Sequence, residues 1–194
     1  MKTQCHNPYL PLWEHIPDGE PHVFEDRLYI FGSHDLENGN EFCEQDYVSW
    51  SAPLDDLSDW RYEGVIYRKD QDPYNVNVLP LYAPDVVQGR DGRYYLYYCI
   101  KFQDSINVAV CDTPAGQYEF YGRVQYKDGQ AMMENQTYDP SVICTEEGNF
   151  LYFGFAPCMI NIPRYKDQDL KGGSVLQLED DMITVKEGPQ VIIP

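Results

Sequence analysis

Acidic residues beside prolines recur at three places in this chain of 194 residues. The carboxylates concerned are Asp18 and Glu20 at the first place, Asp85 at the second and Asp139 at the third. Carboxylates held together in a partly desolvated pocket push one another's pKa values apart, so that one acts as an acid while another stays a base. A single Asp-Pro or Glu-Pro pair usually marks a turn. Recurrence at the same position of three repeats favours acid–base catalysis instead.

The three places begin copies of one sequence pattern, at residues 20–29, 84–96 and 139–152. Each copy continues through a short apolar stretch and an acidic or glycine turn into an aromatic run. Tyr, Phe and Val dominate the apolar runs, and 14 Pro and 14 Gly interrupt them, which is typical of all-β proteins. Repeated strand-like copies predict a β-propeller in which each copy makes one four-stranded blade.

The predicted blades cover residues 18–67, 82–125 and 138–187 of a single partial propeller domain over 1–194. In the third blade the predicted outer strand is 182–185, which leaves Glu187 in a connecting turn. Val23, Val86 and Val142 should hold equivalent positions on the innermost strands. A closed propeller needs at least four blades, so we expect the chain to be the N-terminal portion of a longer propeller.

The innermost strands of a propeller run in the same direction, so acidic residues at their starts should meet at one mouth. Asp18 and Glu20 are two residues apart and should share one face of the entering strand. Asp85 follows its proline, whereas Glu20 and Asp139 precede theirs. A shift of one residue turns a side chain to the other face unless a bulge corrects it. Asp85 is therefore the weakest member of the set, and its predicted role is substrate binding.

The composition excludes several classes of partner. A formal net charge of −18 argues against nucleic acid, because phosphates are neutralised by clustered Lys and Arg, and it suits a neutral ligand such as a sugar. No segment approaches the ~20 apolar residues of a membrane helix, and no signal-peptide core is evident, so we expect a soluble cytoplasmic protein. The six cysteines include no C-x-x-C pair, and residues 70–72 are interpreted as a solvated turn rather than a calcium loop. We therefore expect no metal and no cofactor.

Ordered motifs in the chain resemble glycoside hydrolase family 43. They are Asn7-Pro8, Glu20-Pro21-His22-Val23-Phe24 with Arg27-Leu28-Tyr29, Tyr82-Ala83-Pro84-Asp85-Val86, Asp91-Gly92-Arg93-Tyr94-Tyr95 and Tyr138-Asp139-Pro140-Ser141-Val142. The resemblance covers nearly the whole chain. It implies a five-bladed propeller that hydrolyses arabinose- or xylose-containing glycans with inversion, as an arabinofuranosidase or xylosidase of carbohydrate metabolism.

The resemblance also implies catalytic roles: an Asp general base on blade one, an Asp on blade three that tunes and orients the acid, and a Glu general acid on a later blade. Asp139 matches the second role. The base is either Asp18, which has the family's residue type, or Glu20, which has the better alignment. Glu187-Gly188-Pro189 is similar to the motif that carries the acid, but no aromatic hairpin follows it, and the alternative is an acid beyond Pro194.

Aromatic residues near the motifs could form a platform for a sugar, although most tyrosines should be packing residues. The platform candidates are Trp13, Tyr82, Tyr138 and Phe155. His34 lies beside the predicted mouth, as either a substrate contact or a structural hydrogen-bond partner. Two alternatives to an active enzyme stay open: a carbohydrate-binding or scaffold propeller without chemistry, and an enzyme remnant that lacks its acid. The isolated chain should be inactive and should self-associate through its open edges.

Overall fold

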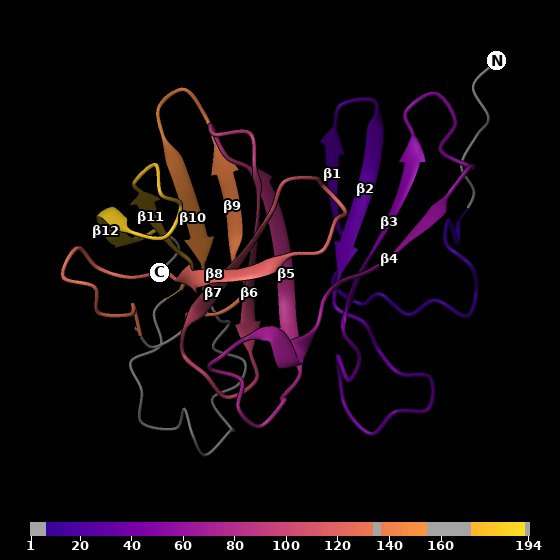
Figure 1. Ribbon diagram of the computed structural model, residues 1–194, viewed down its shortest axis with the longest axis horizontal. Helices are drawn as coiled ribbons and strands as arrows, with labels where there is room; N and C mark the ends of the chain where they lie inside the picture. The colour runs from indigo at the N-terminus through magenta and orange to yellow at the C-terminus, as the bar shows by residue number, and fades with distance from the viewer. Residues whose placement is uncertain (1–6, 134–136, 155–171, 193–194) are drawn as a thin grey trace.

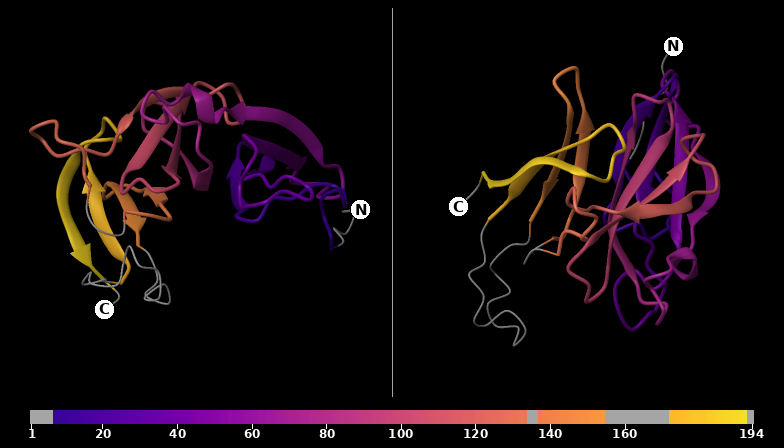
Figure 2. Two further views of the ribbon diagram at one scale, coloured as in Figure 1. Left: turned by 90° about the horizontal axis from the view of Figure 1, so that it is seen from below. Right: turned by 60° about the vertical axis from the view of Figure 1, so that its left-hand side comes forward.

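The computed structural model describes residues 7–133, 137–154 and 172–192, and these form three four-stranded antiparallel sheets that follow one another in chain order (Figure 1). This confirms the all-β prediction of three four-stranded blades. The sheets fan out along an arc when seen from one end (Figure 2, left). A short 3₁₀ helix, η1 (Lys69–Gln71), lies in the crossover between the first two sheets. No described helix is long and apolar enough to cross a membrane.

Each sheet is an up-and-down meander. The first contains β1 (Glu20–Phe24), β2 (Arg27–Gly32), β3 (Tyr47–Pro53) and β4 (Arg61–Tyr67). The second contains β5 (Leu81–Gln88), β6 (Tyr94–Ile100), β7 (Ile106–Cys111) and β8 (Glu119–Arg123). The third contains β9 (Ser141–Cys144), β10 (Asn149–Phe153), β11 (Ser174–Leu178) and β12 (Val185–Val191).

The outer strand of the third sheet differs from the predicted one. Residues 182 and 183 belong to a turn that the Asp181 side chain organises, since Asp181 Oδ1 accepts from the backbone N–H groups of Ile183 and Thr184. Thr184 forms an isolated bridge with Gln125. An Asp that bonds the backbone two and three residues ahead stabilises a turn against a strand. The outer strand therefore begins at Val185, and Glu187 lies inside β12 rather than in a connecting turn.

Three valines hold equivalent positions on the innermost strands β1, β5 and β9, as predicted. Val23 pairs with Leu28, Val86 with Leu96, and Val142 with Leu151. Val86 packs into the core between the first and second sheets, and Val142 into the core between the second and third. Val23 is 56% exposed, against 0% and 5% for the others, because no described sheet precedes the first.

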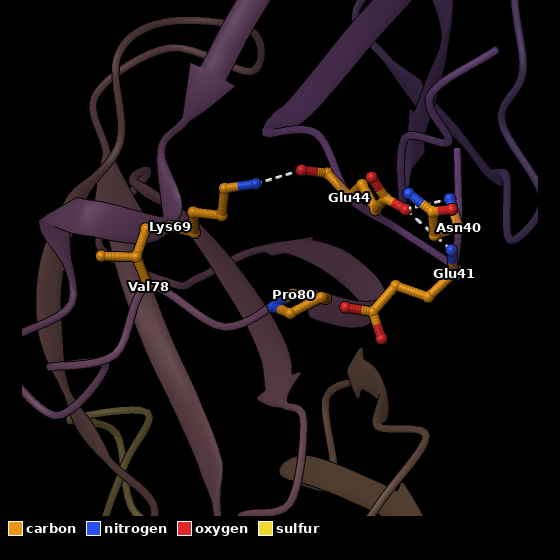
Figure 3. A pocket seen from close by; sticks show the side chains of 6 residues that line it. All are labelled: Asn40, Glu41, Glu44, Lys69, Val78 and Pro80. Atoms are coloured by element: carbon orange, nitrogen blue, oxygen red, sulfur yellow. Dashed lines mark hydrogen bonds between the residues drawn. The ribbon is translucent and has the colours of Figure 1, made fainter. Parts of the chain in front are cut away.

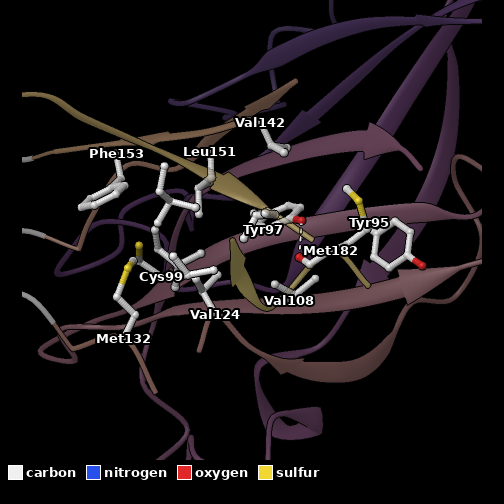
Figure 4. Packing of buried hydrophobic residues seen from close by; sticks show 14 of the residues in the cluster. Tyr95, Tyr97, Cys99, Val108, Val124, Met132, Val142, Leu151, Phe153 and Met182 are labelled. Atoms are coloured by element: carbon white, nitrogen blue, oxygen red, sulfur yellow. Dashed lines mark hydrogen bonds between the residues drawn. The ribbon is translucent and has the colours of Figure 1, made fainter. Parts of the chain in front are cut away.

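Strand β6 is buried over its whole length and joins the two cores. Because side chains alternate along a strand, its even-numbered residues face the first sheet and its odd-numbered residues face the third. Figure 4 shows Tyr95, Tyr97 and Cys99 among the side chains of the third sheet. This continuous apolar run is typical of a strand that is covered on both faces.

The segment 7–19 lies on the outer face of the first sheet. The ring of Trp13 is 5.8 Å from that of Trp50, and the ring of Tyr9 is 5.2 Å from that of Trp60. Ile16 packs so closely on Gly32 that a Cβ at that glycine would lie 2.0 Å from Ile16 Cγ2. The segment therefore covers part of the face that a preceding blade would cover.

Candidate active site

The innermost strands β1, β5 and β9 all start at the same end of the molecule, the lower end in Figure 1. Three of the candidate carboxylates lie at or just before these starts, and the fourth, Asp85, lies four residues after the start of β5. Asp18 and Glu20 lie at the first sheet, Asp85 at the second and Asp139 at the third. We call this end the mouth.

Asp85 is a buried junction between the three innermost strands. Its Oδ1 lies 2.6 Å from Nε2 of His22 in β1 and accepts from its neighbour's N–H, Val86 N, at 2.8 Å. Its Oδ2 accepts from Val142 N in β9 at 2.6 Å. A register shift between Tyr82 and Asp85 produces this orientation, which is the bulge that the offset from proline made necessary. Both oxygens are engaged by protein groups, so Asp85 joins the three innermost strands.

Glu20 is an exposed residue that belongs to the same group. Partial burial raises its pKa, the negative charge of Asp85 raises it further, and His22 lowers it. Ligand atoms of Glu20, His22 and Asp85 lie within 4.8 Å of one another, which is close enough to hold a cation. The direct contact between His22 and Asp85 already explains this closeness without one.

Asp18 lies in the turn before β1, not on the strand face of Glu20, because β1 begins only at Glu20. The expectation that the two carboxylates share a strand face is therefore wrong. Asp18 Oδ2 accepts a 3.3 Å hydrogen bond from Ser33 Oγ, at the end of β2, and its carboxylate is exposed. Ser33 Oγ in turn accepts from Ala83 N at 3.2 Å, which connects the Asp18 turn to the second sheet.

Asp139 is the third-sheet carboxylate and it is coupled to Asp18. Burial by surrounding protein raises the pKa of the Asp139 carboxyl, and the negative charge of Asp18 raises it further. Asp139 has φ +50°, and Ala83, which also precedes a proline, has φ +45°. Glu20 precedes a proline too but has no positive φ. By backbone conformation, the second-sheet equivalent of Asp139 is thus Ala83, and Glu20 is not its equivalent in the first sheet.

Glu187 lies far from the mouth. Across the third sheet Glu187 pairs with Gln177, Gln177 with Phe150, and Phe150 with Ile143. Three interstrand steps of about 4.8 Å make roughly 14 Å from Glu187 to Ile143. Asp139 precedes Ile143 by four residues (143 − 139), which adds roughly 13 Å along the strand. The acid of an inverting pair lies roughly 6.5–9.5 Å from the base across the mouth, so a position this far from the mouth carboxylate Asp139 does not suit Glu187 as the acid.

Of the predicted sugar-platform residues that the structure describes, Tyr82 and Tyr138 belong to one core cluster and Trp13 lies elsewhere. Tyr138 is buried in the core between the second and third sheets. Tyr82 is half-buried near the mouth. Burial, and to a lesser extent the nearby Cys43, raises the pKa of its hydroxyl to about 12. Trp13 lies against Trp50 on the outer face of the first sheet. Phe155 lies outside the described residues.

His34 has a buried acidic partner that the sequence analysis did not identify. Its Nε2 lies 2.8 Å from Glu14 Oε1, and Trp50 Nε1 donates to Glu14 Oε2 at 2.6 Å. Glu14 thus connects segment 7–19 to the first sheet and holds the His34 ring. Ser33 was missed as well. A polar residue at the mouth end of an apolar strand was the available signal for it.

The sequence of the chain matches a known protein family and several known enzymes. Residues 20–194 match the family described as glycosyl hydrolases family 43. The chain belongs to glycoside hydrolase family 43. A xylosidase/arabinosidase of Thermoclostridium stercorarium is 53% identical over 199 residues, which cover 100% of this chain and 41% of that protein. Xylosidase/arabinosidase 43A of Humicola insolens is 32% identical over 158 residues, which cover 74% of this chain and 45% of that protein.

Solved structures agree with the family 43 fold. The β-xylosidase/α-arabinofuranosidase CoXyl43, from a compost microbial metagenome, superposes with a TM-score of 0.72 at 24% identity over 97% of this chain and 62% of that one. RS223 β-xylosidase superposes with a TM-score of 0.68 at 26% identity, over 92% of this chain and 59% of that one. The chain thus spans about two-fifths of the first-named curated relative and corresponds to part of a family 43 propeller.

Proposed function

We propose that this chain contributes a general base and an orienting aspartate to an inverting glycoside hydrolase acting on arabinose- or xylose-containing glycans. Family 43 membership and the similarity to xylosidase/arabinosidases support this reaction class. The observation that carries the proposal is the electrostatic coupling of Asp18 to Asp139 across the mouth. A partly buried carboxyl whose pKa is raised further by the carboxylate of another blade is typical of acid–base sites.

Asp18 is the general base in this proposal. Its carboxylate is exposed and accepts a hydrogen bond from Ser33, so one oxygen is fixed while the carboxylate stays open to a water molecule. The base removes a proton from that water, which attacks the anomeric carbon from the face opposite the leaving oxygen. Glu20 is the weaker choice for the base because, after partial burial, its neighbours Asp85 and His22 have the largest influence on its pKa.

Asp139 keeps the proton donor protonated and oriented. A carboxylate close to a second carboxyl group disfavours ionisation of that group, so the donor would keep its proton near neutral pH. The donor itself is a carboxylic acid outside the described residues, since Glu187 is on the outermost strand of its sheet. It protonates the leaving oxygen as the glycosidic bond breaks.

The position of Glu187 also favours a second candidate function for the chain on its own, which is sugar binding without hydrolysis. An aryl pentoside with a good leaving group needs little protonation, whereas one with a poor leaving group needs much. The isolated chain should hydrolyse neither, or only the first and slowly. Equal cleavage of the two aryl pentosides would show that the chain already contains a proton donor, and Glu187 would be the first candidate.

The test of the catalytic roles uses an active form of the protein that spans the length of its relatives. Asp18→Asn and Asp139→Asn should each lower turnover of aryl arabinosides or xylosides by roughly 10²–10⁴ while the fold stays intact. Glu20→Gln, the matched control, should change turnover by less than about tenfold. The reverse result, a large loss for Glu20→Gln and none for Asp18→Asn, would move the base to Glu20. Unchanged turnover for Asp139→Asn would remove Asp139 from the mechanism.

A further inference from the structure

Two phenylalanines at the mouth end are exposed to an unusual degree. Phe42, in the loop between β2 and β3, is 75% exposed, and Phe102, in the turn after β6, is 64% exposed. β2 and β6 both end at the mouth, where β1 and β5 start (Figure 1). Exposed aromatic side chains that gather beside a candidate site mark ligand-binding surfaces more often than isolated apolar residues do.

The protein holds both rings outward by specific backbone contacts. Phe102 has φ +64°, which is a true outlier for a bulky residue, and its turn is closed by Gln103 N donating to Ile100 O at 3.0 Å. Phe42 precedes the buried Cys43, which has φ +57° and whose N–H donates to Asp35 Oδ1 at 2.6 Å. Strained backbone of this kind persists where the surroundings enforce it, and it concentrates at functional sites.

An ion pair joins the two loops. Glu41, beside Phe42, contacts the Lys101 ammonium, and that ammonium lies 4.9 Å from the centre of the Phe102 ring. The pair joins the loop of the first sheet that carries Phe42 to the turn of the second sheet that carries Phe102. Because the ammonium covers part of Phe102, the ligand would use the remaining exposed face. We call Phe42 and Phe102 the aromatic rim.

Glu41, which precedes Phe42, lines a pocket of about 430 Å³ (Figure 3), and ligand pockets span roughly 300–1,000 Å³. It is lined by Asn40, Glu41, Glu44, Lys69, Val78 and Pro80. Figure 3 shows the Lys69 ammonium bonded to the backbone oxygen of Glu44 and the Glu41 carboxylate beside Pro80. Both lysines near the pocket thus have partners, so it offers acceptors to hydroxyl groups and no free cation, among the described residues, to an anion.

The aromatic rim is continuous with the proposed catalytic site. The thiol of Cys43, next to Phe42, lies near enough to Ser33 and Asp18 for both to influence its pKa, and Ser33 donates to the proposed base Asp18. Lys101 N, next to Phe102, donates to Pro80 O at 3.0 Å, one residue before β5. We propose that the aromatic rim and its pocket bind the units of a neutral pentose chain that lie beyond the sugar being cleaved.

The chemistry of the site selects this ligand. The C–H-rich face of a pentose ring packs on an aromatic ring, and its hydroxyls bond to carboxylates such as Glu41. The chain's net charge of −18 disfavours anionic glycans. The inference rests on the proposed function for the position of the cleaved unit, but binding to the aromatic rim can be measured without hydrolysis.

The experiment titrates the 194-residue chain with xylobiose, xylopentaose and a galacturonate pentamer by calorimetry. We expect xylopentaose to bind more tightly than xylobiose, and the anionic pentamer not to bind. Phe42→Ala and Phe102→Ala should each weaken xylopentaose binding by roughly tenfold, and Phe42→Tyr and Phe102→Tyr should retain it. Tyr62→Ala, an exposed aromatic at the far end of the first sheet, is the matched control and should have no effect.

The outcomes separate this inference from the proposed function. The proposal that the aromatic rim binds sugar is overturned if the wild type and both alanine variants bind xylopentaose equally well. It is also overturned if the wild type does not bind xylopentaose. Loss of affinity in the alanine variants but not in the tyrosine or Tyr62→Ala variants supports it. The same loss of affinity, together with unchanged turnover for Asp18→Asn and Asp139→Asn in the active form, would support sugar binding by the aromatic rim. It would contradict the proposed catalytic roles of Asp18 and Asp139. Matching thermal unfolding of all variants establishes that the fold is retained.

Discussion

Asp139 has a left-handed backbone at φ +50° and a carboxyl whose pKa is raised, and these two properties can be separated by substitution. A raised pKa in the folded state means that the folded protein binds the proton more readily than the unfolded chain. The group therefore adds stability below its unfolded pKa of about 3.9, and this stability is lost as the pH rises through the folded pKa. At neutral pH the ionised carboxylate is a destabilising element.

We therefore expect Asp139→Asn to raise the stability of the chain at pH 7 relative to wild type, and the difference to shrink as the pH falls toward 3. Asn tolerates the left-handed conformation as Asp does, so the backbone is unchanged. Urea unfolding over this pH range measures the difference. Asp55→Asn, at an exposed position, is the control and should show no such trend. A variant that is less stable than wild type at pH 7 would contradict the expectation.

Asp85 should behave in the opposite way, because its carboxylate satisfies buried donors. Asp85→Asn would direct an amide N–H₂ at the N–H of Val142 or at His22 and leave one of them unsatisfied. We expect a loss of about 3 kcal/mol in the free energy of unfolding, the scale for breaking a buried charged hydrogen-bond group. Glu20→Gln, an exposed neighbour, should cost less than about 0.5 kcal/mol. A similar small change for both variants would show that Asp85 does not join the blades.

The spacing of residues about proline predicted part of this site. It singled out Asp85 as the carboxylate that needed a bulge, and the bulge is present. It could not separate Asp18 from Glu20, because a residue before proline has no fixed φ: Asp139 and Ala83 take the left-handed conformation there, whereas Glu20 does not. Glu14 and Ser33 were not predictable, since their partners come from other strands and segments.

At the scale of elements, alternation and turn chemistry decided what the sequence could predict. The aromatic run of β6 forms a strand as predicted, and its two faces fill two cores. The outer strand of the third sheet was misplaced because Met182 and Ile183 look strand-like, while the side chain of Asp181 holds them in a turn. Local hydrogen bonds from backbone N–H groups to an acidic side chain thus outweighed apolar composition.

Segment 7–19 offers a prediction at this scale, because its fit on the first sheet depends on a glycine. Gly32→Ala would place a Cβ 2.0 Å from Ile16 Cγ2, so Ile16 and its segment must move. We expect a loss of roughly 1–3 kcal/mol in the free energy of unfolding, the usual cost of overpacking. Faster proteolysis within residues 7–19 should accompany it.

A double-mutant cycle with Ile16→Ala tests the cause. If the clash with Ile16 is responsible, Gly32→Ala should cost less in the Ile16→Ala background than in wild type, with a coupling above about 0.5 kcal/mol. Additive effects of the two substitutions would show that Gly32 affects the free energy of unfolding for a reason other than its contact with segment 7–19. Gly92→Ala is the control for a generic glycine effect, because its φ of +84° adds backbone strain while no atom lies within 4 Å of the added Cβ.

At the scale of the whole molecule, three blades on an arc leave two sheet faces without a neighbouring blade (Figure 2). Segment 7–19 covers part of the first of them, but Val23 stays exposed. On the third sheet, Ile143 and Tyr152 belong to the inner strands β9 and β10 and are 47% and 40% exposed. Apolar side chains on inner strands become buried when another sheet packs on them.

We therefore expect the isolated chain to self-associate in solution through these faces, because exposed apolar patches and unpaired strand edges favour association. Sedimentation velocity over a range of concentrations should show species larger than 22.6 kDa. Ile143→Glu places a charge on the third-sheet face and should shift the distribution toward monomer. Val76→Glu, at an exposed apolar residue in the crossover between the first two sheets, is the matched control and should leave it unchanged. A wild-type chain that stays monomeric at all concentrations would mean that the two faces are stable in water, and that three blades suffice for a soluble unit.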